Sequence, residues 1–337
     1  MKELKNHFIH PKQSMTDATL SKEARDRIIR EIRMVQKHPL TSEGIWVLPD
    51  ETDLRIVRAC IQGPEGTPYE NGFYLFRLEF PENYPYSPPK ATYFTTDGGS
   101  RMHPNYYCSG KVCVSIIGTW SGPGWTSCQN LSSVLLTFRS LLIENPLWQE
   151  PGFENKVNEQ NTDYNELIRY ENMRVGILRS FHHTPVEFEG FQDLMRAYLI
   201  QYRERIMEQA ITGETIAVSR AVIKDKIKET TMHPIENAVV SSPQIYNFQK
   251  VIHYKKIQEK LNTLYMELLP PRNAHLLPEL RALMESVAEE GKLMYKDVLK
   301  LTREFTDEYG ENINYLLALL EIEGHVTRDV RGCVVIT

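Results

Sequence analysis

The first hundred residues change from a helical to a strand-like hydrophobic pattern. Over residues 20–38, apolar positions recur every three or four residues with arginines and lysines between them, which predicts an amphipathic helix. Ser21 precedes the first charged turn and is a suitable N-cap residue. The pattern then favours strands, at residues 45–48, 54–61 and 73–80.

Alternation is clearest in the third of these segments. Two stretches of turn-forming residues, 63–68 and 70–72, separate it from the second segment. Consecutive strands joined by short turns predict an antiparallel meander. The two sides of the third segment carry Phe73, Leu75, Arg77 and Glu79 on one side and Tyr74, Phe76, Leu78 and Phe80 on the other.

The rest of the chain is irregular at first and then helical. A proline cluster at 81–89 excludes a helix or a central strand. Residues 98–128 are rich in Gly, Ser, Pro and Asn, and irregular stretches of that length inside a domain are usually functional. Helical periodicity follows at 131–143 and 164–181, and it resumes from residue 191 onward. The order of elements predicts an α+β domain with an all-helical C-terminal extension.

Composition narrows the class of protein. The 337 residues are 41% hydrophobic and 25% charged, with a net charge of −5, as in soluble globular proteins. The mild charge argues against a nucleic-acid partner, and no apolar run is long enough for a membrane span. Five cysteines, an odd number, argue against a disulfide framework and favour the cytosol or nucleus. Cys333 lies fifth from the C-terminus, one position away from that of a prenylation signal.

The candidate chemistry lies in the irregular segment. His103-Pro104-Asn105 is followed, eight residues after the asparagine, by Cys113. An ordinary thiol is a few per cent thiolate at neutral pH and is a nucleophile without an elaborate base. No Cys–His pair with a partner carboxylate is evident nearby. The residues therefore favour exchange between thioesters over amide hydrolysis, which needs a positioned general base.

Four ordered landmarks carry a family resemblance. They are Tyr84-Pro85-Tyr86-Ser87-Pro88-Pro89-Lys90, then His103-Pro104-Asn105, then Cys113, and then Trp125 leading into a helix. In this order the chain resembles the ubiquitin-conjugating (E2) enzymes. Gly118-Thr119-Trp120-Ser121-Gly122-Pro123 and Glu150-Pro151-Gly152-Phe153 resemble the subgroup with enlarged active-site loops, which includes the Z-type enzyme and the O-type hybrid enzymes.

The resemblance implies a UBC-type fold. This fold has an N-terminal helix, a four-stranded antiparallel meander, an irregular active-site segment and C-terminal helices. We expect a tail at 1–17, the core domain at 18–185 and the helical extension at 186–337. The resemblance is strong from about residue 20 to 180 and fades toward 265.

The resemblance also implies roles at the reaction centre. Cys113 matches the cysteine that carries the modifier as a thioester. Asn105 matches an asparagine that either stabilises the oxyanion of the tetrahedral intermediate or braces the loop. Glu150 matches an acidic gate residue near the incoming lysine, and a solvated loop carboxylate is the alternative.

Three further positions match partner-binding residues of the family. Arg27 and Arg30 correspond to basic positions of the first helix that dock on the activating enzyme, E1. Tyr86 corresponds to an aromatic residue that meets RING-type ligases, E3. The implied partners are therefore ubiquitin or a ubiquitin-like protein, an E1, and E3 ligases as a further class.

Some positions depart from the family pattern. The segment between Cys113 and Trp125 is longer than in minimal members, so we expect an enlarged rim around the active site. Ser115 stands where many members have aspartate, which removes one source of lysine activation. Thr126-Ser127-Cys128 replaces the Ser-Pro-Ala of RING-responsive members, which puts pairing with ordinary RING ligases in doubt.

Alternative interpretations remain open from the sequence. Cys108 is either a bystander or a partner for a reversible disulfide with Cys113. A zinc site is disfavoured because no C-x-x-C pair is present, and we expect neither a metal nor an organic cofactor, ATP being used upstream by the E1. The rival functions are a hybrid E2/E3 whose extension selects substrates and an inactive E2 variant that binds ubiquitin.

Overall fold

The computed structural model of the chain describes residues 20–227, 238–241, 246, 249–268, 282, 284, 292–293, 326–328 and 334–336. The predicted tail at 1–17 and the cysteine at 333 lie outside the described residues. No helix in the described part of the chain has the length and apolar character needed to cross a membrane.

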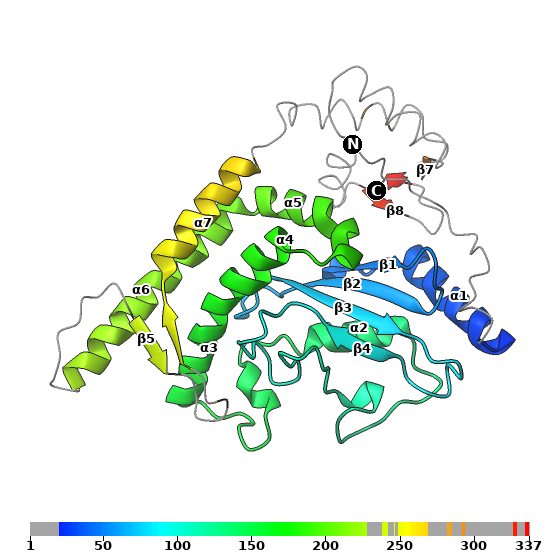
Figure 1. Cartoon of the computed structure of the whole chain (residues 1–337), viewed down its shortest axis with the longest axis horizontal. Coiled ribbons are helices and arrows are strands. Elements are labelled where there is room, and N and C mark those ends of the chain that lie inside the picture. Colours follow the sequence, from blue (N-terminus) through cyan, green and yellow to red (C-terminus); the bar gives the residue numbers. More distant parts are fainter. Residues whose placement is uncertain are drawn as a thin grey trace.

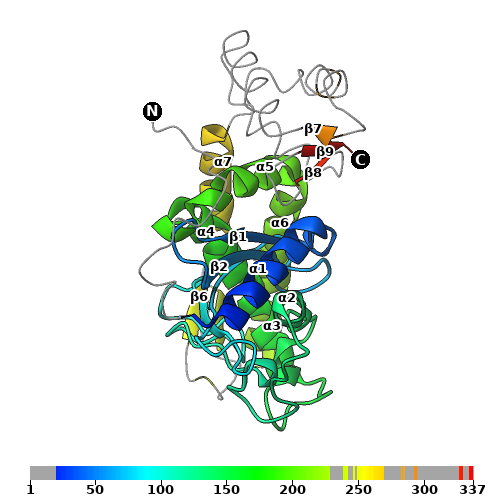
Figure 2. The same ribbon diagram turned by 90° about the vertical axis from the view of Figure 1, so that its right-hand side faces the viewer.

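The first helix forms as its pattern predicts. Helix α1 spans Lys22–Lys37, and the Ser21 hydroxyl accepts a hydrogen bond from the Ala24 N–H at 3.0 Å. This bond satisfies one of the backbone donors that a helix leaves open at its start. The helix buries its apolar stripe, which includes Ile28 and Val35, and it packs against α2, Leu131–Ser140 (Figure 2).

The predicted meander is a four-stranded antiparallel sheet in sequential order. Its strands are β1 (Ile45–Pro49), β2 (Ile56–Gln62), β3 (Phe73–Glu79) and β4 (Lys90–Tyr93). Register pairs Cys60 with Leu75 and Phe76 with Tyr93. The fourth strand begins directly after the proline cluster, where a ladder N–H is available again.

The later helices are interrupted rather than continuous. The short helices η2 (Thr41–Glu43), η3 (Ser115–Ile117) and η4 (Pro146–Gln149) lie between larger elements. Then α3 (Glu159–Glu171), the π-helical η5 (Asn172–Arg179) and α4 (Ser180–His182) run on as one rod. Asn172 is the first residue of η5; its side chain accepts a hydrogen bond from the Tyr74 hydroxyl at 2.6 Å and donates one to the Glu70 carbonyl at 2.8 Å.

Each face of the sheet has its own hydrophobic cluster. One cluster joins Phe76 and Leu78 of β3 to α1 and α2. The other joins Phe73 and Leu75 of the same strand to the rod and to the extension, as the alternation along β3 requires. Figure 1 shows α5 above the sheet and α2 below it. The second cluster crosses the expected boundary at residue 185.

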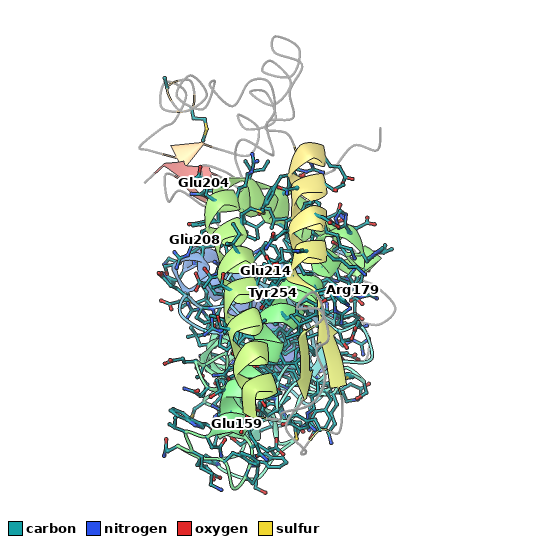
Figure 3. The ribbon with its side chains drawn as sticks, turned by 90° about the vertical axis from the view of Figure 1, so that its left-hand side faces the viewer. Glu159, Arg179, Glu204, Glu208, Glu214 and Tyr254 are labelled. Carbon is teal, nitrogen blue, oxygen red and sulfur yellow. The ribbon has the colours of Figure 1, made fainter. Side chains whose placement is uncertain are left out.

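The extension is helical at first, as predicted. Its helical elements are η6 (Val186–Phe191), α5 (Gln192–Gln201), α6 (Arg203–Ile227) and α7 (Tyr254–Glu267). Helices α6 and α7 lie side by side, and α6 also contacts α3 (Figure 1). The ring of Tyr254 packs against Gly213, where a Cβ would collide with it, and it lies between the two helices (Figure 3).

The expectation of an all-helical extension is wrong. The extension also contains a two-stranded sheet, β5–β6, and a three-stranded sheet in the order β7-β9-β8. Their bounds are Ala238–Ser241, Gln249–Ile252, Lys292–Leu293, Val326–Arg328 and Val334–Ile336. Most of these strands carry adjacent β-branched residues, such as Val239-Val240 and Val334-Val335, which favour a strand over a helix.

Candidate active site

The His103-Pro104-Asn105 turn is fixed by the imidazole. The Asn105 N–H donates to Nδ1 of His103 at 2.9 Å, so the ring proton lies on Nε2, 2.8 Å from the Leu141 carbonyl that accepts it. Burial lowers the pKa of His103 to about 3, and the ring is neutral at physiological pH. The ring also stacks on Tyr106 with centroids 4.4 Å apart. A neutral histidine with both ring nitrogens hydrogen-bonded thus orients Asn105.

A tight reversal of the chain explains the eight-residue spacing between Asn105 and Cys113. The Tyr107 N–H donates to the Lys111 carbonyl at 2.9 Å, and Gly110 takes a φ of +87° that favours glycine. The Cys113 N–H donates to the Asn105 carbonyl at 2.9 Å, while the Asn105 side-chain amide donates to the Cys113 carbonyl at 2.7 Å. Asn105 therefore holds the cysteine's backbone from two directions.

Of the two roles expected for Asn105, the bracing arrangement is the one present here. Its amide N–H is engaged by the carbonyl of Cys113, and its own Oδ1 is buried without a hydrogen-bond partner among the described residues. An oxyanion role requires the amide to turn from that carbonyl toward the acyl group on sulfur.

The enlarged rim, which is the segment between Cys113 and Trp125, closes over the Cys113 thiol. The Cys113 thiol donates to the Thr119 carbonyl at 3.0 Å, and Cys113 is only 3% exposed. Thr119 is itself held by Val114, because its hydroxyl accepts from the Val114 N–H at 2.9 Å and donates to the Val114 carbonyl at 3.1 Å. Gly118 has a φ of +70°, which turns the chain so that Thr119 lies back against Val114. In this arrangement the Thr119 carbonyl covers the thiol, so access to the sulfur requires the rim to shift.

Glu150 lies in a cluster that reaches from the turn to the extension. Its Oε2 accepts a hydrogen bond from the Tyr246 hydroxyl at 2.7 Å and lies 4.0 Å from the Arg101 guanidinium. That guanidinium donates to the Pro104 carbonyl and stacks on Tyr107, 3.9 Å from the ring centroid. The predicted gate carboxylate is therefore connected, through Arg101, to the turn that carries Asn105.

The three predicted partner-binding residues lie together on one face. Arg27 and Arg30 line a groove of about 520 Å³ between α1 and Pro85, which is also lined by Lys22, Glu23 and Asp26. Tyr86 is 66% exposed beside this groove, and its hydroxyl donates to Glu23 at 2.9 Å.

Arg27 and Arg30 nevertheless differ in their surroundings. Arg30 is exposed, whereas Arg27 pairs with Glu31 and donates to the Gln129 carbonyl at 2.9 Å. Glu31 is 5% exposed; it accepts from the Tyr84 hydroxyl at 2.7 Å and from the Leu131 N–H at 2.8 Å. Arg27 therefore belongs to the joint that connects α1 to the start of α2, and Arg30 is the more available cation.

Four residues of the site were not predicted from the sequence. Glu31 had a signal, because it falls within the buried stripe of α1, at positions 28, 31, 32 and 35. Arg101 had a weak one, since it lies two residues before His103. Thr119 falls within the loop motif at 118–123, but it acts through its backbone carbonyl, so nothing indicated its contact with Cys113. Tyr246 comes from a distant part of the chain and had no signal.

Comparison with known proteins decides the family of this region. Residues 27–172 match the family described as ubiquitin-conjugating enzyme. Residues 27–172 form a ubiquitin-conjugating enzyme domain. The match includes Cys113 and the landmarks around it, and it ends at Asn172, where the π-helical η5 begins.

Relatives of the ubiquitin-conjugating domain are themselves curated enzymes. The ubiquitin-conjugating enzyme E2 Z of Xenopus tropicalis is 46% identical over 153 residues, which is 45% of this chain and 48% of the relative. The E2 Z of Homo sapiens is 45% identical over 153 residues, covering 45% of this chain and 43% of the relative. The chain spans about half the length or less of these relatives.

A second kind of relative matches a longer part of the chain. The human dual E2 ubiquitin-conjugating enzyme/E3 ubiquitin-protein ligase BIRC6 is 31% identical over 238 residues, which is 67% of this chain and 5% of that protein. Both the Z-type and the hybrid resemblance seen in the sequence are thus confirmed, and the domain belongs to a family of transferases.

Proposed function

We propose that the chain is an E2 enzyme that accepts ubiquitin, or a ubiquitin-like modifier, as a thioester on Cys113 and passes it to an amine or to a ligase. The observation that carries this proposal is the position of Cys113, whose backbone is held on both sides by Asn105 of the His-Pro-Asn turn. The reaction needs no metal or organic cofactor of its own, and a reducing compartment, cytosol or nucleus, suits a nucleophilic thiol.

Charging is an exchange of one thioester for another. The sulfur of Cys113 bonds to the carbonyl carbon of the modifier, the carbon–sulfur bond to the activating enzyme breaks, and the proton lost by Cys113 goes to the departing thiol. The groove lined by Arg27 and Arg30 is the proposed docking face for the activating enzyme. Arg30, which is exposed, is the better candidate of the two for a direct contact.

Discharge forms an amide from the thioester. A lysine amine attacks the carbonyl carbon, the carbon–sulfur bond breaks, and Cys113 leaves as a thiolate. The amine loses a proton, for which the Glu150 carboxylate is the proposed acceptor. With Ser115 in place of the family's aspartate, Glu150 is the acidic group left to this step by the family pattern.

The test is charging with a ubiquitin-activating enzyme, ATP and ubiquitin, read on a non-reducing gel. We expect an adduct that thiol reagents remove, that Cys113→Ala abolishes and that Cys113→Ser converts into a stable oxyester, since an alkoxide is a poorer leaving group. Cys128→Ala is the matched control because Cys128 is exposed and lies outside the reversal that holds Cys113. An adduct that survives Cys113→Ala would show the proposal to be wrong.

A hybrid E2/E3 is the second candidate. The contact between Tyr246 of the extension and Glu150 favours it, as does the longer match to a dual E2/E3 protein. It predicts efficient conjugation of a substrate without an added ligase. The inactive-variant alternative is disfavoured by the cysteine at position 113.

A further inference from the structure

Tyr246 brings the extension into contact with Glu150. It follows Glu150 by 96 residues, and its hydroxyl donates to Glu150 Oε2 at 2.7 Å. Burial and this hydrogen bond raise the pKa of Tyr246 well above its usual range, so the phenol remains a proton donor at physiological pH. The contact is a hydrogen bond to a charged acceptor, which is stronger than one between neutral groups.

The ring of Tyr246 has partners of its own. The Arg101 guanidinium lies 4.5 Å from its centroid, so that Arg101 is held between the rings of Tyr107 and Tyr246. The ring of Tyr164 in α3 lies 5.6 Å from it, centroid to centroid. Loss of the hydroxyl alone therefore leaves the ring anchored, and the hydrogen bond can be tested separately from the packing.

The two oxygens of the Glu150 carboxylate have different surroundings. Tyr246 and Arg101 both approach Oε2, and no described residue donates a hydrogen bond to Oε1. Contacts to one oxygen restrict the movement of the carboxylate, and they leave the other oxygen free to meet an incoming group. A swinging carboxylate would lose this orientation each time it turned.

From this geometry we propose that Tyr246 is a positioning residue for aminolysis, and that the extension sets the rate of discharge by fixing the direction of Glu150. The inference rests on the proposed function of Cys113. Oε1 of Glu150 accepts the proton that the attacking amine loses, and Tyr246 keeps its own proton throughout. Charging does not involve an amine, so Tyr246 does not affect it.

The test compares single-hydroxyl deletions in the full chain. Tyr246→Phe removes the donor and keeps the ring. Tyr265→Phe is the matched control, because the buried hydroxyl of Tyr265 has no hydrogen-bond partner within the described part of the chain. Each variant is charged with a ubiquitin-activating enzyme, ATP and ubiquitin, and its thioester is then discharged with free lysine at several concentrations. Thermal unfolding of each variant checks its fold.

We expect Tyr246→Phe to charge at the rate of the unmodified protein and to show a kcat for discharge lowered about tenfold, the scale of one hydrogen bond to a charged group, with little change in KM for lysine. Tyr265→Phe should match the unmodified protein in both steps. In a Glu150→Gln background, Tyr246→Phe should add no further loss, because the two residues act as a unit.

The inference alone would be overturned by normal discharge from a charged Tyr246→Phe protein, or by an equal loss with and without the Glu150 carboxylate. A change in charging that matches the change in discharge would also overturn it, since a general weakening of the fold affects both steps. Failure of the unmodified protein to charge would instead overturn the proposed function, and this inference with it.

Discussion

The two faces of the sheet are equally well buried but are covered by different parts of the chain. Phe76 and Phe73 on β3 point to opposite faces, and both are fully buried. The cover over Phe76 comes from α1 and α2, within the ubiquitin-conjugating domain. Most of the cover over Phe73 comes from elements beyond residue 172. The extension is therefore a layer of the fold and contributes to the second core of the same sheet.

The second face is only partly covered, and β3 shows where the cover ends. Phe73 and Leu75 lie under the extension, whereas Arg77 and Glu79 on the same side of β3 remain half-exposed. A guanidinium nitrogen of Arg77 lies 3.5 Å from a carboxylate oxygen of Glu79. The change from apolar to charged along one side of one strand marks the edge of the extension.

Removing the extension is the strongest test of this comparison. Truncation after residue 190 exposes Phe73, Leu75 and the apolar residues of the rod at once, and we expect the product to aggregate or to lack a cooperative transition. Solubility and thermal unfolding measure this outcome. A truncated protein that is soluble, folded and charged normally would show the extension to be an independent module.

A pair of single substitutions compares the faces directly. Phe138→Ala in α2 and Phe188→Ala in η6 each remove a fully buried ring, one from each cluster. We expect each to lower the free energy of unfolding by about 3–5 kcal/mol, in a single denaturant transition, since one sheet joins both clusters. Val186→Ala is the control because Val186 is 81% exposed. A much smaller effect at Phe188 would break the equivalence of the two faces.

The carboxylate of Asp97 should have a smaller effect on the free energy of unfolding, and this effect depends on pH. Burial raises the pKa of Asp97, but hydrogen bonds from Arg174 of η5 and from the backbone N–H groups of Gly99 and Ser100 outweigh it and hold that pKa well below its usual range. The ionised form therefore stabilises the fold above the unfolded-state pKa, about 3.9, and that contribution is lost as pH falls toward the folded-state value.

Asp97→Asn should consequently flatten the acid limb of the stability curve between about pH 5 and pH 2, with little change in its slope near neutrality. Denaturant unfolding at a series of pH values measures it. An unchanged acid limb would mean that the ion pair between Arg174 and Asp97 does not stabilise the folded chain.

The prediction of the fold from the sequence succeeded where a local pattern carries the information. The alternation of β3, the Ser21 cap and the eight-residue spacing to Cys113 all reflect interactions between neighbours in the chain, or across one turn. The identity of the second layer could not be predicted, because the side of β3 that carries Phe73 indicates that something covers it and does not indicate what.

The candidate site shows the same division. Cys113 and Asn105 are recognisable from residue type and spacing. By contrast, the Thr119 contact is made by a backbone oxygen that every residue possesses, and Tyr246 is brought to Glu150 by the fold of the whole extension. The four-residue spacing of Arg27 and Glu31 predicts only an ordinary ion pair along a helix. In the structure Glu31 is buried, and it connects α1 to Tyr84 and to the start of α2.

The hydrogen bond between the Cys113 thiol and the Thr119 carbonyl bears on how this protein withstands reactive chemicals. Soluble electrophiles and oxidants attack exposed thiolates most readily. Cys128 is exposed, whereas Cys113 is buried and its thiol is hydrogen-bonded to the Thr119 carbonyl. We therefore expect chemical damage to fall first on Cys128, while Cys113 stays protected as long as the rim covers it.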